Sequence, residues 1–176
     1  RFRCQGTAEE WNPVNGRIWQ AGATQADGYT SVTLDLRQAE SRFIVFRHQG
    51  TSPAQPRPAA RCGQEIHITG PWHLSFPQGW GAPDSLLVTE LKPWKDLPLG
   101  PEGRSFSGTA TYTTTLHIDK VYGQTSYLLH LGRVDMIAEV LVNGHPAEVL
   151  WTEPYTTEVG HLLHEGDNTL TVRVTS

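Results

Sequence analysis

Cysteine is scarce in this sequence of 176 residues, which contains only Cys4 and Cys62. Two cysteines are too few for a disulfide framework, and their separation matches no metal-site spacing. They can form a disulfide only if their Cα atoms lie within about 7 Å of each other. A disulfide and two free thiols therefore both remain open.

The sequence also lacks a net positive charge and long apolar runs. The formal net charge is -4 at pH 7, and both signs are mixed along the chain, so no basic stripe is available to neutralise a phosphate backbone. No apolar run is long enough to cross a bilayer, and residues 1–4 lack the apolar stretch of a signal peptide. We therefore expect neither a nucleic-acid nor a membrane partner. The chain begins without Met and ends inside a predicted strand, so we expect a piece of a longer protein.

Uninterrupted helical patterns are missing as well, because 17 glycines and 12 prolines divide the chain into short segments. The clearest strand is Asn168–Val174, where Leu170, Val172 and Val174 alternate with polar residues. The same alternation predicts strands at Val32–Leu36 and at Thr109–Ile118. These segments should each be half buried.

Two other runs, Phe43–Phe46 and Tyr127–Leu131, are almost continuously apolar, which predicts central strands covered on both faces. A further strand, Ile137–Val142, leads directly into Asn143-Gly144, a dipeptide typical of tight turns. Asn15-Gly16 and Asp27-Gly28 predict turns in the same way. Many short strands at this spacing favour an all-β fold, a β-sandwich or jelly roll.

The segment 51–60 contains Pro53, Pro56 and Pro58 among small residues, which predicts a linker because proline cannot donate into a β-ladder. Residues 1–50 then hold about four strands that complete a preceding β-sandwich. Residues 61–176 contain enough strands to close a core alone.

Several motifs in the second part occur in a familiar order: Phe106–Tyr112, Leu129–Val134, Glu139–Gly144, Leu150–Tyr155 and Gly166–Leu170. In order and spacing they resemble the sugar-binding, galactose-binding-like jelly roll of glycoside hydrolase family 2, from about Gly70 to the end. A closer resemblance is to the C-terminal sandwich of family 106 α-L-rhamnosidase-like enzymes. It is carried by the segments Gly70–Phe76, Leu91–Asp96, Glu10–Gly16 and Ser41–Arg47.

This resemblance implies a bacterial glycoside hydrolase whose acid/base residues lie in a separate barrel domain of the same parent chain. The segment itself would be an accessory, non-catalytic domain in carbohydrate degradation, packed against that barrel. An extracytoplasmic location, periplasmic or secreted, follows from the resemblance alone. The residues also leave open an autonomous carbohydrate-binding module and a purely structural interdomain-packing module.

The best candidate for sugar contact is the loop Leu150–Tyr155, because Trp151 and Tyr155 can stack on a pyranose while Glu153 accepts hydroxyl hydrogen bonds. In family 2 the matching loop reaches toward the catalytic pocket. Alternatively, Trp151 caps the core and Tyr155 begins the next strand. Trp80, between glycines, is either a second sugar platform or a packing residue.

The other polar and aromatic candidates favour structural roles. Trp72 and Trp94 are interpreted as core residues, and Asn143 as a turn residue. Glycoside hydrolysis requires two carboxylates about 5–10 Å apart, and no acidic pair is singled out by its spacing, so we predict no catalytic residue. His161 and His164 have no acidic or cysteine ligand at zinc spacing. We predict no cofactor and no metal, with a carbonyl-bound structural calcium left open.

Overall fold

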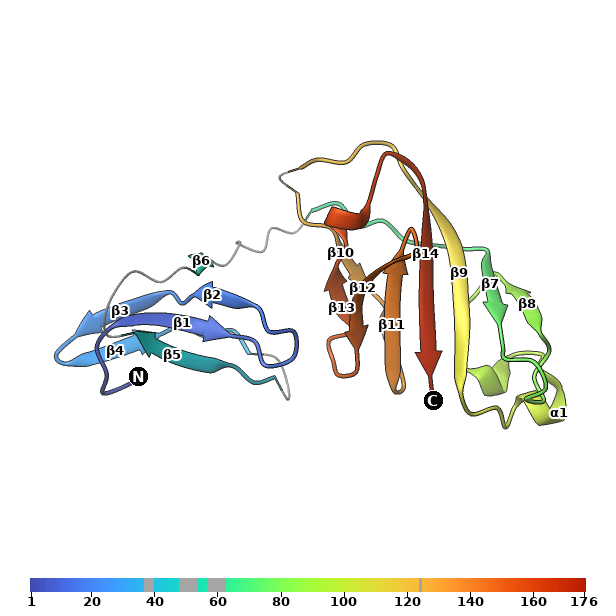
Figure 1. Cartoon of the computed structure of the whole chain (residues 1–176), viewed down its shortest axis with the longest axis horizontal. Helices are drawn as coiled ribbons and strands as arrows, with labels where there is room; N and C mark the ends of the chain where they lie inside the picture. Colours follow the sequence, from blue (N-terminus) through green and yellow to red (C-terminus); the bar gives the residue numbers. More distant parts are fainter. Residues whose placement is uncertain (37–39, 48–53, 57–62, 124) are drawn as a thin grey trace. The chain divides into compact units, whose positions relative to one another are not determined.

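The computed structural model describes residues 1–36, 40–47, 54–56, 63–123 and 125–176. The chain divides into two compact units, unit 1 (Arg1–Gln64) and unit 2 (Glu65–Ser176). Strands make up most of the regular secondary structure in both, so the predicted all-β class is confirmed (Figure 1). Among the described residues no helix is long and apolar enough to span a bilayer. Cys62 lies outside the described residues, so its pairing with Cys4 is not tested by the structure.

Unit 1 contains one mixed sheet and one hairpin. The sheet has the strand order β5-β1-β2-β6, in which β6 pairs in parallel with β2 and the other pairs are antiparallel. The hairpin joins β3 to β4. The strand bounds are β1 Thr7–Trp11, β2 Ile18–Gln20, β3 Ala23–Ala26, β4 Tyr29–Val32, β5 Phe43–Arg47 and β6 Gln55–Pro56.

Three predictions for unit 1 need correction. The strand predicted at Val32–Leu36 is wrong beyond its first residue, because β4 ends at Val32. The run Phe43–Phe46 does form a strand, but β5 lies at the sheet edge and Phe43 is 62% exposed, so it is not covered on both faces. Within the predicted linker, Gln55–Pro56 pairs with β2 as an edge strand, a position that tolerates the missing N–H of proline. Most of that linker lies outside the described residues.

Unit 2 is a two-layer arrangement with a six-stranded antiparallel sheet of order β12-β11-β14-β9-β7-β8 and a small sheet formed by β10 and β13 (Figure 1). A hydrogen bond of 2.8 Å from Thr157 Oγ1 on β13 to Glu148 Oε2 on β12 joins the two sheets. The strand bounds are β7 Trp72–Ser75, β8 Ser85–Val88, β9 Thr109–Ile118, β10 Leu128–His130, β11 Ile137–Val142, β12 His145–Leu150, β13 Thr156–Glu158 and β14 Gly166–Thr175. The short helix α1 spans Gly100–Gly103.

Alternation of apolar residues predicted the central strands well. The predicted bounds of β9 and β11 are confirmed, and the predicted strand Asn168–Val174 lies inside β14. Leu170 and Val172 are buried in the core, as expected from period two. The run Tyr127–Leu131 was wrongly predicted as a central strand, because β10 pairs with β13 alone and Leu128 is 56% exposed.

The core of unit 2 is a cluster of seventeen buried residues that includes Trp72 and Leu74. Trp72 is therefore a core residue, as predicted. Trp94 packs edge-on against Phe76 and Phe106, and its Nε1 donates to the hydroxyl of Tyr112 at 2.7 Å. Burial raises the pKa of that hydroxyl.

The turn predicted at Asn143-Gly144 is confirmed, since both residues have positive φ. The Asn143 side chain does more than permit this backbone. Its Nδ2 donates to the carbonyl oxygen of Leu162 and to Asn168 Oδ1, and its Oδ1 accepts from the Thr169 amide. Because Asn168 is only 1% exposed, this network fixes the hairpin tip to the loop before β14.

Candidate functional site

Trp151 lies on the outer face of the six-stranded sheet, directly after β12. Leu150 points into the core opposite Ala138, so strand alternation places Trp151 on the outer side beside Ile137. Its side chain is 57% exposed. The interpretation of Trp151 as a cap on the core is therefore wrong, and the ring is available for contact.

Trp151 belongs to an exposed apolar patch at the outer corner of β11 and β12. We call this the β11–β12 patch; it consists of Ile137, Val149 and Trp151, all exposed and on the outer face by strand alternation. Glu153, in the loop after Trp151, is exposed too. An aromatic ring with a carboxylate nearby can stack on a sugar and accept hydroxyl hydrogen bonds.

Tyr155 belongs to the core. Its side chain is only 8% exposed, its hydroxyl donates to the Met136 carbonyl oxygen at 3.3 Å, and its own carbonyl accepts from the Leu131 amide at 2.9 Å. These bonds connect the loop after β12 to the loop before β11. The buried ring offers no face for stacking, and the next strand, β13, begins at Thr156, one residue after the predicted start at Tyr155.

Trp80 lies in the loop between β7 and β8. Its ring is 59% exposed and tilts against Phe106 with a centroid distance of 6.3 Å. The strand registers place the Trp80 loop and Trp151 at the same end of the sheet, since Ser75 pairs with Thr111 and Ala138 with Leu150. Four strand spacings separate β7 from β12, about 19 Å in total. The two tryptophans therefore cannot stack on one sugar ring.

The carboxylates of unit 2 that form hydrogen bonds are engaged in structural contacts. Glu148 accepts from Thr157, Glu158 accepts from the Gly160 amide at 2.8 Å, and Glu139 pairs with Arg173 at 3.0 Å. Among the described residues, no group of three or more His, Cys, Asp or Glu side chains is placed to hold a metal ion.

His117, on β9, is paired with two carboxylates. Its Nδ1 lies 2.6 Å from Asp167 Oδ1, and its Nε2 lies 3.5 Å from Asp119 Oδ1. The hydrogen bond with Asp167 raises the pKa of His117. The imidazole is 63% exposed, so the cluster is a surface ion pair.

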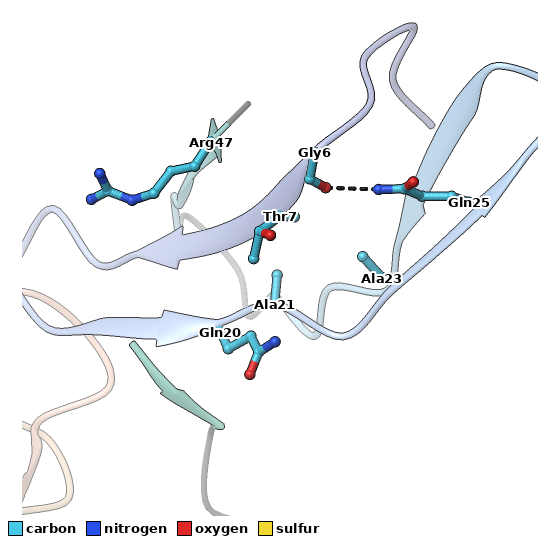
Figure 2. A pocket seen from close by; sticks show the side chains of 8 residues that line it. Gly6, Thr7, Gln20, Ala21, Ala23, Gln25 and Arg47 are labelled. Atoms are coloured by element: carbon cyan, nitrogen blue, oxygen red, sulfur yellow. Dashed lines mark hydrogen bonds between the residues drawn. The ribbon is translucent and has the colours of Figure 1, made fainter. Parts of the chain in front are cut away.

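Unit 1 contains an open hollow of about 420 Å³ that no motif predicted (Figure 2). Gln25 Nε2 crosses one side of it to donate to the Gly6 carbonyl oxygen at 2.7 Å. Arg47 borders it, with Nε 2.6 Å from Glu9 Oε1, and this bond raises the pKa of Arg47. The lining comes from separate strands, which is why sequence spacing gives no signal. The residues are Gly6, Thr7, Ala8, Gln20, Ala21, Ala23, Gln25 and Arg47.

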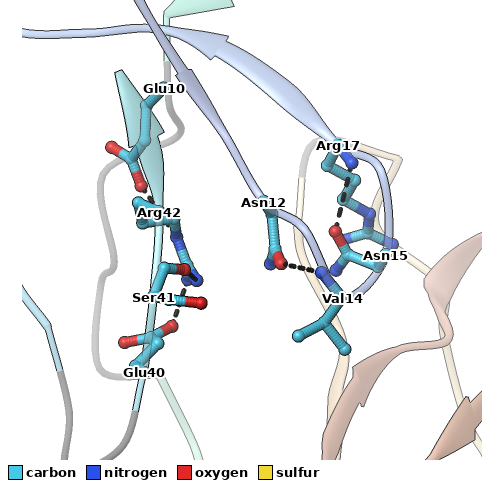
Figure 3. A network of polar contacts seen from close by, with 8 residues as sticks. All are labelled: Glu10, Asn12, Val14, Asn15, Arg17, Glu40, Ser41 and Arg42. Carbon is cyan, nitrogen blue, oxygen red and sulfur yellow. Dashed lines mark hydrogen bonds and ion pairs between the residues drawn. The ribbon is translucent and has the colours of Figure 1, made fainter.

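Unit 1 also contains a network of ion pairs that no sequence motif predicted, centred on Arg42 (Figure 3). Its guanidinium contacts Glu10 at 3.0 Å and also pairs with Glu40, and the Arg42 side chain is 5% exposed. Nearby turns are closed by Asn12, which accepts from the Val14 amide, and by Asn15, which accepts from the Arg17 amide. Charged groups thus fill positions in unit 1 where a sandwich normally buries apolar side chains.

Comparison with solved structures identifies a rhamnosidase from Novosphingobium sp. PP1Y, 33% identical with a TM-score of 0.86. The match covers 99% of this chain and 17% of the rhamnosidase chain. A β-D-glucuronidase from Dictyoglomus thermophilum, 20% identical with a TM-score of 0.52 over 61% of this chain and 19% of its own, shares the fold of that part.

No family model matches the chain. Among curated proteins, the "Putative beta-glucuronidase" of Formosa agariphila is 35% identical over 116 residues, 64% of this chain and 10% of that protein. This chain thus spans about a sixth or less of these two bacterial relatives. By these similarities it is a β-sandwich segment of the kind associated with glycoside hydrolases.

Proposed function

We propose that this chain is an accessory, non-catalytic segment of a larger bacterial glycoside hydrolase, which acts in carbohydrate degradation. The observation that carries the proposal is the rhamnosidase match, which extends over 99% of this chain but only 17% of that enzyme. A catalytic domain in the remaining polypeptide is the partner that this proposal requires. An extracytoplasmic location of the parent protein belongs to the same proposal.

The geometry of unit 2 supports this role. A hydrolytic site needs two carboxylates about 5–10 Å apart across a space that admits the glycosidic bond. Glu148 and Glu158 are instead occupied in contacts that connect strands and loops. A cavity inside the sandwich has a volume of about 20 Å³, room for about one water molecule, and is lined mainly by apolar side chains.

A hydrolysis assay tests the proposal. The 176-residue chain and the longer polypeptide that contains it are incubated with an aryl α-L-rhamnoside and an aryl β-D-glucuronide, and phenol release is followed. We expect turnover by the longer polypeptide and none by the chain. Hydrolysis by the chain itself, abolished by substitution of one of its own carboxylates, would overturn the proposal.

A second candidate is a carbohydrate-binding module, favoured by the exposure of Trp151 and Trp80 together with Glu153. Since about 19 Å separates the strands that lead to these tryptophans, they would contact different residues of an oligosaccharide or belong to separate sites. Each side chain would supply an aromatic face, which is the usual apolar contact of a sugar ring.

Calorimetric titration with oligosaccharides at millimolar concentration tests this second candidate. We expect Trp151→Ala to reduce affinity at least about tenfold, because stacking groups at the centre of a contact carry much of its energy. Leu87→Ala, at a side chain that is 58% exposed on β8, is the matched control and should leave binding unchanged. Absence of any saturable heat with the unmodified chain would eliminate the binding role and leave the accessory one.

A further inference from the structure

One face of the unit 1 sheet carries an open row of apolar side chains. Trp11 on β1 pairs with Phe43 on β5 and with Ile18 on β2, so the three side chains lie side by side on one face. Phe43 is 62% exposed and Ile18 is 41% exposed. We call this set the Phe43–Trp11–Ile18 row. In the neighbouring register Val45 pairs with Glu9 on the same face.

The Trp11 ring is held in place from within the sheet. Its Nε1 donates to Glu9 Oε2 at 2.9 Å, and Glu9 Oε1 accepts from Arg47 at 2.6 Å. Glu9 is completely buried although it lies on the face that carries the row. A ring fixed in this way loses little conformational entropy when a partner covers it, which is the property of a preorganised anchor.

Unit 1 buries few apolar side chains completely, although Trp11, Ile44 and Phe46 are half-buried. Within its described residues, Ala8 is the one apolar side chain that is buried, and the buried polar residues are Glu9, Glu10 and Thr30. A sheet becomes stable when an apolar face packs against a second layer about 10 Å away. The Phe43–Trp11–Ile18 row lies on a face of this kind, with Phe43 and Ile18 exposed and Trp11 half-buried.

We propose that the Phe43–Trp11–Ile18 row is the docking face for another β-sheet layer of the same polypeptide, outside residues 1–176. This inference rests on the proposed function, because the rhamnosidase match implies about five-sixths of a polypeptide beyond the matched segment. A second copy of this chain is less suited to a row of three side chains, since stable dimers bury about 800 Å² per partner. A tethered layer has a millimolar effective concentration and needs far less area.

Amide hydrogen exchange in two contexts tests this docking. The longer polypeptide and the 176-residue chain are labelled under the same conditions, and the peptides that contain β5 and β14 are compared. We expect protection of β5 to rise at least about tenfold in the longer polypeptide, because covering the face suppresses local opening, while β14 changes little. Equal protection of β5 in both contexts would overturn the inference.

Phe43→Asp supplies a second test, with Leu87→Asp on β8 as the control at a similarly exposed apolar position. We expect Phe43→Asp to remove the context-dependent protection of β5 and Leu87→Asp to leave it intact. If instead the 176-residue chain is a dimer that Phe43→Asp dissociates, the row is covered by a second copy and the inference is wrong. If the longer polypeptide hydrolyses glycosides but shows no context effect, the docking fails while the proposed function stands.

Discussion

The two units bury different kinds of side chain. Unit 2 closes around a continuous apolar cluster that includes Trp72, Leu74 and Val140. Unit 1 buries charged residues, with Glu9 and Glu10 among its least exposed side chains and Arg42 and Arg47 as their partners. Apolar burial contributes about 25 cal/mol per Å², whereas ion pairs gain little after desolvation. We therefore expect unit 2 to supply its own stability and unit 1 to gain stability from a surface that covers it.

The largest expected effect comes from Leu74→Ala, at a completely buried position in unit 2. Loss of packing and the cavity left behind should lower the free energy of unfolding by about 2–5 kcal/mol. Phe43→Ala, at a 62% exposed side chain of unit 1, should change it by less than about 0.5 kcal/mol in the 176-residue chain. Urea unfolding of both variants measures the contrast. Equal losses would show that unit 1 also has an apolar core.

An intermediate effect is expected from Glu9→Gln in unit 1. Removing the charge weakens the bonds to Arg47 and Trp11 and should reduce local stability of β1 and β5 by about 1–2 kcal/mol. Hydrogen exchange of β1 and β5 peptides measures it. Glu139→Gln, in the exposed pair with Arg173, is the control and should cost less than about 0.5 kcal/mol. If β1 and β5 keep full protection in Glu9→Gln, the bonds of the buried Glu9 carboxylate do not hold unit 1 together.

The smallest effect concerns pH and His117 in unit 2. Because Asp167 raises the folded-state pKa, the protonated form stabilises the fold. This contribution is fully present below the unfolded-state pKa of about 6.5 and is lost as pH rises through the higher folded-state pKa. Asp167→Asn should bring the His117 pKa back toward its ordinary value, as measured by NMR titration of the ring. A His117 pKa that is unchanged in Asp167→Asn would show that this pair does not set it.

Sequence reasoning predicted the strands whose alternation reflects burial on one face. Thr109–Ile118 and Ile137–Val142 have the predicted bounds because each contributes a period-two set of side chains to the core of unit 2. Apolar runs were less informative. Phe43–Phe46 and Tyr127–Leu131 have the apolar pattern of central strands, but a strand's place in its sheet depends on partners distant in sequence.

The candidate site shows the same limit. Trp72 begins β7 and Trp151 follows β12, yet Trp72 is buried and Trp151 is exposed. Exposure depends on which face of the sheet each side chain occupies. The sequence predicts Tyr155 as a stacking residue, but its ring is buried and its hydroxyl donates to the Met136 carbonyl oxygen. The ion pair between Glu9 and Arg47 joins residues on neighbouring strands, and no local motif reports such a pairing.

Native-state hydrogen exchange of the 176-residue chain tests most directly whether unit 2 is self-supporting while unit 1 is not. We expect amides of β9, β11 and β14 to exchange only through global unfolding, and amides of β1 and β5 to exchange at least about a hundredfold faster through local opening. Equal protection of the two units would contradict this division. It would mean that unit 1 is stable without a partner layer, and that covering the Phe43–Trp11–Ile18 row is not needed to stabilise it.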